Sequence, residues 1–200
     1  EENFNGYFGT TGAATSADWN PVYNTAGVLT GYAPNPATET GKLLNRYGFA
    51  TDGFGYRWHT TDPRFDLVTN PNEANLFGWV VEIDPFNPTA MPVKRTALDR
   101  FKHESAQYVV DSQNNVAMYM GDDERNEYIY KFVCAGKFNP TNKAANRNLL
   151  DSGTLYVARF DANLTGEWLP LVPGTIGLNG VALRDNPNFT GANDAEVQAK

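Results

Sequence analysis

The segment from Leu76 onward alternates short apolar runs with turn sequences, and this alternation constrains the fold more than any other feature. Each run is five to nine residues long and rich in aromatic and β-branched residues, a composition typical of strands. The runs are LFGWVVEID, QYVVD, NVAMYM, EYIYKFVCA, TLYVARFDA and EWLPLV, separated by turns such as DPFNP, QNN, GDDERN and NLTG. The last four runs predict consecutive antiparallel strands, as in a four-stranded propeller blade, with part of a β-sandwich as the alternative.

The rest of the chain shows little regular periodicity. Residues 1–41 are rich in Gly, Asn, Thr, Ala and Pro and follow neither hydrophobic period, which predicts a long loop. Residues 42–175 are expected to hold the blade strands of a single domain, and residues 176–200 a loop and the start of a further element. Helix should be scarce: about two turns over Asn142 to Leu150, with Thr141 as the N-cap.

Composition excludes several classes of protein. The formal net charge of -7 argues against nucleic acid or an anionic membrane surface as a partner, because both require a basic surface. No apolar run reaches the length of a membrane span, while 41% hydrophobic residues are enough for a packed core. The single cysteine, Cys134, excludes an intrachain disulfide and is expected to be a small buried thiol within a strand.

Acidic residues gather at the two ends of one predicted hairpin. Glu104 precedes the run 107–111, a turn follows at 113–115, and the return strand leads to Asp122 and Asp123. Antiparallel pairing would bring these carboxylates to the same end of the sheet. Because clustered carboxylates repel one another unless cations lie between them, the pattern predicts a metal site.

Other familiar sites are absent from the sequence. His103 and Glu104 begin like a zincin HExxH motif, but Gln107 stands where the second histidine is needed. There is no GxSxG nucleophile motif, no P-loop and no DxDxDG calcium loop. Any calcium would therefore be bound by residues from separate segments.

Three long stretches carry a family resemblance. They are WVVEIDPFNP (residues 79–88), PVKRTALDRFKHESA (92–106) and VAMYMGDDERNEYIYKFV (116–133). Each resembles a core motif of the PhoX-type bacterial alkaline phosphatases, and the opening EENFNGYF resembles the segment that follows a metal-binding cysteine in that family. The resemblance implies an all-β, six-bladed β-propeller that is exported by the twin-arginine route to the periplasm or beyond. It also implies iron(III) and calcium as cofactors and phosphomonoesters as substrates.

The resemblance also implies site residues. Glu104 and Asp123 are the first candidates as catalytic metal ligands, and Asp122, in the same loop as Asp123, is a further candidate metal ligand. Glu1 and Glu2 match the paired acids that follow the family's cysteine, and either could bind metal. Hard cations prefer such oxygen ligands, so His103 is expected to pack or to support a ligand rather than to bind metal.

The loop around Asp123 offers further candidates. Arg125 is a candidate for phosphate binding. At least one of Asp122, Glu124 and Arg125 is expected to make turn hydrogen bonds or a salt bridge instead of touching metal.

Two departures from the family pattern stand out. The family has glycine where Asp99 and Ser105 stand, and glycine marks positions that need a permissive backbone.

The family's cysteine would lie one residue before Glu1, so the chain is expected to be an interior portion of the enzyme that associates with the rest of its parent or with itself. The alternatives are a noncatalytic β-rich assembly fragment and a calcium-dependent lactonase-like or sugar-binding propeller.

Overall fold

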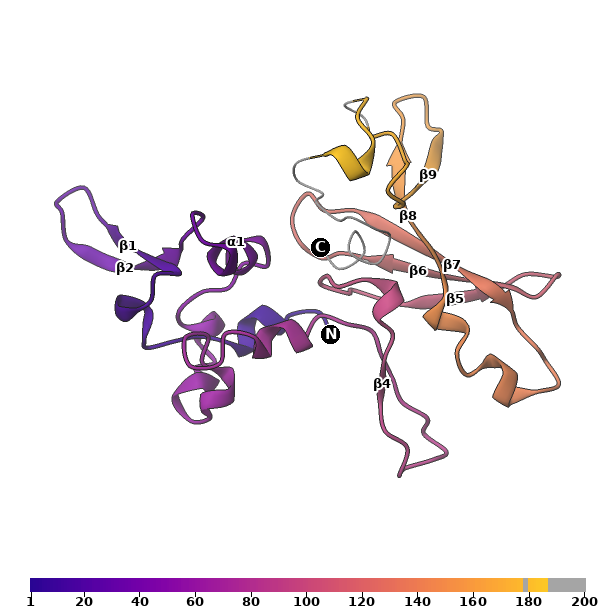
Figure 1. Cartoon of the computed structure of the whole chain (residues 1–200), viewed down its shortest axis with the longest axis horizontal. Coiled ribbons are helices and arrows are strands. Elements are labelled where there is room, and N and C mark those ends of the chain that lie inside the picture. Colours follow the sequence, from indigo (N-terminus) through magenta and orange to yellow (C-terminus); the bar gives the residue numbers. More distant parts are fainter. Residues whose placement is uncertain (178–179, 187–200) are drawn as a thin grey trace. The chain divides into compact units, whose positions relative to one another are not determined.

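The computed structural model describes residues 1–177 and 180–186, which divide into two compact units. We call residues Asn3–Gly78 the N-terminal unit, and Glu1–Glu2 together with the chain from Trp79 onward the sheet unit. Figure 1 shows the elements of both.

A five-stranded antiparallel sheet forms the centre of the sheet unit, with the strands in sequence order from β5 to β9 (Figure 1). The strands are β5 (Gln107–Val110), β6 (Asn115–Gly121), β7 (Ile129–Lys137), β8 (Gly153–Phe160) and β9 (Gly166–Pro170). This meander confirms the predicted run of consecutive antiparallel strands. The described chain is β-rich with little α-helix, as expected.

One face of the sheet carries the core of this unit. Alternate residues of β6, Val116, Met118 and Met120, are buried, as are Phe132 of β7 and Leu155 of β8. Successive side chains of a strand point to opposite faces, so an alternating sequence places its apolar set on one side. The cluster is completed by Leu98, Phe101, Tyr130 and Cys134.

Shorter elements surround this sheet. Two strands of two residues each, β3 (Val81–Glu82) and β4 (Val93–Lys94), pair with each other. A single longer strand was expected over residues 76–84. The 3₁₀ helices are η7 (Thr96–Leu98), η8 (Lys143–Asn146), η9 (Leu149–Asp151) and η10 (Leu183–Asp185).

The helical turns expected over 142–150 are therefore 3₁₀ and interrupted. Asn142, and not Thr141, is the N-cap, because its side chain accepts hydrogen bonds from the amides of Ala144 and Ala145.

Cys134 is buried in β7 within the core, and burial raises the pKa of its thiol, as expected of an inert structural cysteine. Cys134→Ser should lower the free energy of unfolding by about 1 to 3 kcal/mol, because it places a hydroxyl in an apolar site. Urea unfolding would measure this change. The variant should keep its full metal content, and loss of bound iron would show instead that Cys134 is a ligand.

The N-terminal unit contains more regular structure than the sequence predicted. Residues 1–41 were expected to be a loop, yet β1 (Trp19–Tyr23) and β2 (Leu29–Pro34) form a hairpin. The helix α1 (Glu39–Arg46) follows directly. The remaining elements are 3₁₀ helices: η1 (Phe4–Tyr7), η2 (Ala13–Thr15), η3 (Gly53–Gly55), η4 (Trp58–Thr60), η5 (Pro63–Phe65) and η6 (Glu73–Leu76).

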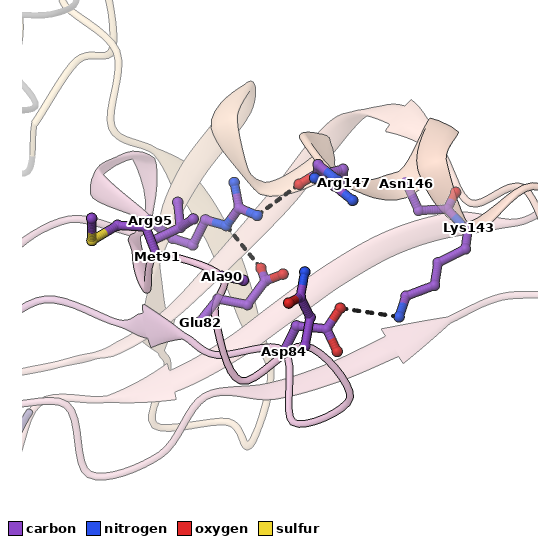
Figure 2. A pocket seen from close by; sticks show the side chains of 10 residues that line it. Glu82, Asp84, Ala90, Met91, Arg95, Lys143, Asn146 and Arg147 are labelled. Atoms are coloured by element: carbon purple, nitrogen blue, oxygen red, sulfur yellow. Dashed lines mark hydrogen bonds and ion pairs between the residues drawn. The ribbon is translucent and has the colours of Figure 1, made fainter.

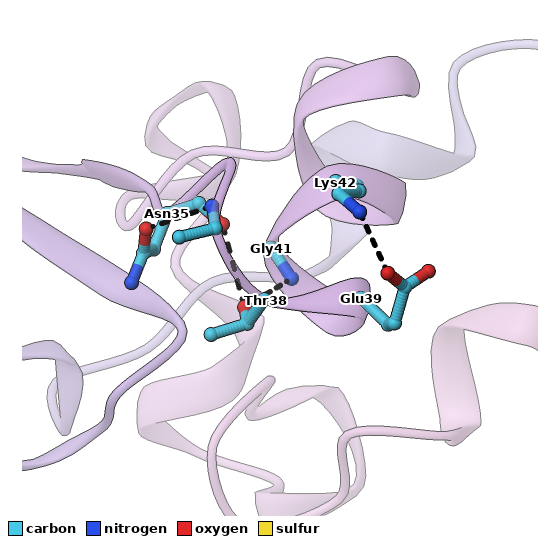
Figure 3. A network of polar contacts seen from close by, with 6 residues as sticks. Asn35, Thr38, Glu39, Gly41 and Lys42 are labelled. Atoms are coloured by element: carbon cyan, nitrogen blue, oxygen red, sulfur yellow. Dashed lines mark hydrogen bonds and ion pairs between the residues drawn. The ribbon is translucent and has the colours of Figure 1, made fainter. Parts of the chain in front are cut away.

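Hydrogen bonds and an ion pair stabilise the first turn of α1 (Figure 3). The Thr38 hydroxyl accepts a hydrogen bond from the Gly41 amide at 3.0 Å and donates to the Asn35 carbonyl at 3.3 Å. Lys42 pairs with Glu39 within the first turn. Gly41 is required here, because a Cβ at this position would lie 2.0 Å from the Asn35 carbonyl oxygen.

Aromatic side chains build the core of the N-terminal unit. Phe8 packs edge-on against Phe49, Phe65 and Phe77, with ring centroids 5.2 to 5.9 Å apart. Buried Asp66 fixes the adjoining loop by accepting hydrogen bonds from the amides of Val68 and Thr69.

Residues 42–78 contain no strand in the structure, in contrast to the blade strands expected to begin at residue 42.

The structure describes only part of the C-terminal segment 176–200. Residues 176–177 and 180–186 contain the short helix η10, whereas the further element predicted toward residue 200 lies outside the described residues. Within the described part of the chain, every helix is too short or too polar to cross a membrane.

Candidate metal centre

Backbone pairing joins the loop before β5 to the loop after β6. The Glu104 amide donates to the Gly121 carbonyl and the Asp123 amide donates to the Lys102 carbonyl, both at 3.0 Å. An antiparallel bridge joins His103 to Asp122 between them. The hairpin therefore brings Glu104 and Asp123 to the same end of the sheet, as the sequence predicted.

Glu2 joins these two residues. One carboxylate oxygen from each of Glu2, Glu104 and Asp123 lies within 4.8 Å of the other two. Glu104 and Asp123 are exposed and Glu2 is half-buried. We call these three residues the carboxylate cluster.

The neighbouring residue Glu1 holds the start of the chain in place. Its nitrogen donates to the Trp79 carbonyl, and the Trp79 amide donates to its carboxylate Oε2, both at 3.3 Å. These contacts fix the backbone beside Glu2 to the start of the segment that leads into the sheet.

The electrostatics of the cluster favour a cation. The negative charges of Glu2 and then of Asp123 raise the pKa of the Glu104 carboxyl above its ordinary value. A bound cation would offset this repulsion and lower the pKa again. Three carboxylate oxygens form a hard donor set, which suits calcium and iron(III). The residues present therefore fit the metals that the sequence resemblance implies.

The other acidic candidates have different contacts. Asp122 accepts a hydrogen bond from the Glu124 amide at 3.1 Å, while the Glu124 carboxylate pairs with Lys102 and accepts from the Arg125 amide at 2.9 Å. The Lys102 ammonium lowers the pKa of Glu124. This confirms the expectation that part of this loop makes turn hydrogen bonds and a salt bridge. The structure does not bring Glu1, Asp122 or Arg125 into the carboxylate cluster.

His103 is buried and does not belong to the carboxylate cluster. Its ring is buried, with its centroid 3.8 Å from that of Phe101 and its Nε2 3.1 Å from the Asp99 carbonyl oxygen. Burial lowers its pKa to about 4, so the ring is neutral near pH 7. A neutral Nε2–H can donate to Asp99 and so support the residues that precede Glu104.

Asp99 adopts a backbone conformation that ordinarily requires glycine. Its φ of 69° and ψ of 175° fall in a region that is essentially restricted to glycine. The Asp99 carboxylate compensates in part by accepting a hydrogen bond from the Arg100 amide at 2.7 Å. The departure from the family pattern at this position therefore carries strain, whereas the backbone at Ser105 has no positive φ.

Asp99→Gly is expected to raise the free energy of unfolding by about 1 kcal/mol, because glycine adopts this conformation without strain. Ser105→Gly is the matched control. It should lower the free energy of unfolding by up to about 1 kcal/mol, since it only increases the freedom of the unfolded chain. Urea denaturation of both variants gives the two values. Changes of the same sign would contradict the assignment of strain to Asp99.

Sequence pattern alone could not find Glu2. Nothing in spacing or periodicity connects it with Glu104, and only the resemblance of the opening EENFNGYF pointed to it. The contacts of Glu1 with Trp79 supply the physical link.

Comparisons with known proteins point to one family. The family model described as alkaline phosphatase PhoX matches residues 1–200. Among solved structures, the chain is similar to Pseudomonas fluorescens PhoX in complex with vanadate, a transition state analogue, at 42% sequence identity and a TM-score of 0.73. The match covers 100% of this chain and 30% of that chain, so this chain spans about 30% of the length of that protein. No curated protein sequence matched the chain.

Proposed function

Since the chain belongs to the alkaline phosphatase PhoX family, we propose that it contributes to the hydrolysis of phosphomonoesters with release of inorganic phosphate. The observation that carries this proposal is the convergence of carboxylate oxygens from Glu2, Glu104 and Asp123 to within 4.8 Å of one another. The similar solved protein binds vanadate as a transition state analogue, which supports phosphoryl chemistry for the family fold.

The carboxylate cluster is proposed to hold iron(III) and calcium. These ions, when bound, supply positive charge against the phosphate and activate a water-derived nucleophile. Glu104 and Asp123, on two paired backbone segments, would hold the ions, and Glu2 would add a third oxygen donor. Binding a phosphomonoester to this acidic protein depends on such local positive charge.

Arg125 is proposed to orient the substrate phosphate. Its side chain is exposed on the loop that carries Asp123, and its backbone amide is fixed by Glu124 at 2.9 Å. A guanidinium can donate two parallel hydrogen bonds to a phosphate.

We propose further that the meander from β6 to β9 is one blade of a β-propeller. The sequential antiparallel order of the four strands supports this arrangement, although a longer segment with η8 and η9 joins β7 to β8. Export to the periplasm or beyond is proposed from family membership alone.

Metal removal tests the proposed function directly. Purified protein would be assayed for p-nitrophenyl phosphate hydrolysis and for iron and calcium by mass spectrometry, before and after chelation. Hydrolysis should fall to background when the metals are removed and should return when both are restored. Activity that persists without metal would contradict the proposal. Calcium without iron, and no phosphate release, would favour a lactonase-like propeller.

A further inference from the structure

A polar cavity of about 220 Å³ lies beside the β3–β4 pair, within the sheet unit (Figure 2). It shares no residue with the carboxylate cluster. Side chains from the β3–β4 connection and from η8 face it from different sides (Figure 2). The residues that matter for its chemistry are Asp84, Asn87, Met91, Val93, Lys143 and Arg147.

Arg95 forms the rigid wall of this cavity. Its side chain is only 2% exposed, and its guanidinium donates to Glu82 at 2.8 Å and to Asp151 at 2.7 Å. A third bond, from Nη2, reaches the Arg147 carbonyl oxygen at 2.6 Å. The two carboxylates more than neutralise the charge of Arg95, and its third bond holds the Arg147 carbonyl in place.

Apart from Arg95 and its two carboxylates, the charged side chains that line the cavity are Asp84, Lys143 and Arg147, which are two cations and one carboxylate. Lys143 pairs with Asp84 at 3.2 Å. Within the described part of the chain, the guanidinium of Arg147 makes neither a hydrogen bond nor an ion pair, although its backbone is fixed by Arg95. The side chain of Arg147 is exposed, and its charge attracts the Asp84 carboxylate at the same cavity. A guanidinium that makes no hydrogen bond within the described residues can bind a carboxylate or phosphate through two parallel hydrogen bonds.

The other lining residues indicate the rest of the ligand. Lys143 adds a second cation to the lining of the cavity (Figure 2). Met91 and Val93 add apolar surface, which favours a ligand with a short apolar group over a bare inorganic ion. We propose that this cavity binds a small organic oxyanion, with Arg147 as its main contact. This site is independent of the proposed hydrolytic function.

Calorimetric titration of the whole protein with benzoate tests the proposal. Arg147→Gln should weaken benzoate binding about tenfold, because a charge-assisted hydrogen bond is lost. Asp84→Asn should strengthen it roughly threefold, since the competing negative charge beside Lys143 is removed while the hydrogen bond from the Phe86 amide to residue 84 is retained. Acetate should bind more weakly than benzoate because it lacks the apolar ring.

Arg57→Gln is the matched control, because Arg57 is an exposed arginine of the N-terminal unit. It removes the same charge from a different place and should leave benzoate affinity unchanged. If both arginine variants lost the same benzoate affinity, the loss would come from the change in net charge alone, and the proposal would be overturned. No detectable benzoate binding, or an unchanged affinity in Arg147→Gln, would overturn it as well.

Discussion

Glu104→Gln is expected to lower the turnover of p-nitrophenyl phosphate by roughly two orders of magnitude or more and to reduce the iron and calcium content of the protein. The substitution keeps the shape of the side chain and its backbone pairing with Gly121, but it removes a negative charge from the carboxylate cluster. Because the proposed metals and the nucleophile that they would activate depend on the same ligands, both should be lost together. Steady-state kinetics combined with metal analysis would measure the two effects on one sample.

Glu124→Gln is the control for this experiment. Glu124 lies one residue from Asp123, but its carboxylate pairs with Lys102 and does not belong to the carboxylate cluster. Its substitution should cost at most about 1 kcal/mol of stability and should leave the metals bound. Near-normal turnover with full metal content in Glu104→Gln would exclude Glu104 as a ligand.

Arg95→Met is expected to have the largest effect on stability. The substitution leaves Glu82, Asp151 and the Arg147 carbonyl without their shared partner, and removing one member of a buried ion pair costs about 3 to 5 kcal/mol. The lower end is expected, because both carboxylates are about half exposed. The free energy of unfolding from urea titration would give the value.

Arg159→Met provides the comparison. Arg159 also pairs with two carboxylates, those of Asp161 and Glu167, but its side chain is 36% exposed. Its replacement should cost less than about 1 kcal/mol, because water screens exposed ion pairs. If both variants lost the same stability, burial of Arg95 would not explain its contribution.

The sheet was predictable because strand alternation has a strong physical cause. Residues of β6 alternate between the core and the opposite face, and Asn114 supplies the positive φ of 63° that the preceding turn needs. The same pairing predicted that Glu104 and Asp123 would meet. Local pattern and tertiary structure agree in this part of the chain.

The N-terminal unit was not predictable by the same reasoning. Its elements are short, and its fold depends on contacts such as those of Asp66 and Phe8, which join segments far apart in sequence. The helix α1 carried one readable signal, the cap at Thr38, within a stretch whose composition favoured a loop. The cavity beside Arg95 left no sequence signal either, since it requires Arg147 to approach the β3–β4 pair.

The contacts between Glu1 and Trp79 have a consequence for how the protein tolerates change in length. The chain leaves the sheet unit after Glu2 and re-enters it at Trp79, so the whole N-terminal unit is an insertion with neighbouring ends. On the inserted side, the close approach of Phe4 to Gly78 keeps those ends together. Lengthening or shortening such an insertion changes chain entropy only slowly. Changes in the length of residues 3–78 that keep Phe4 beside Gly78 are therefore expected to leave the distance between Glu2 and Glu104 unchanged.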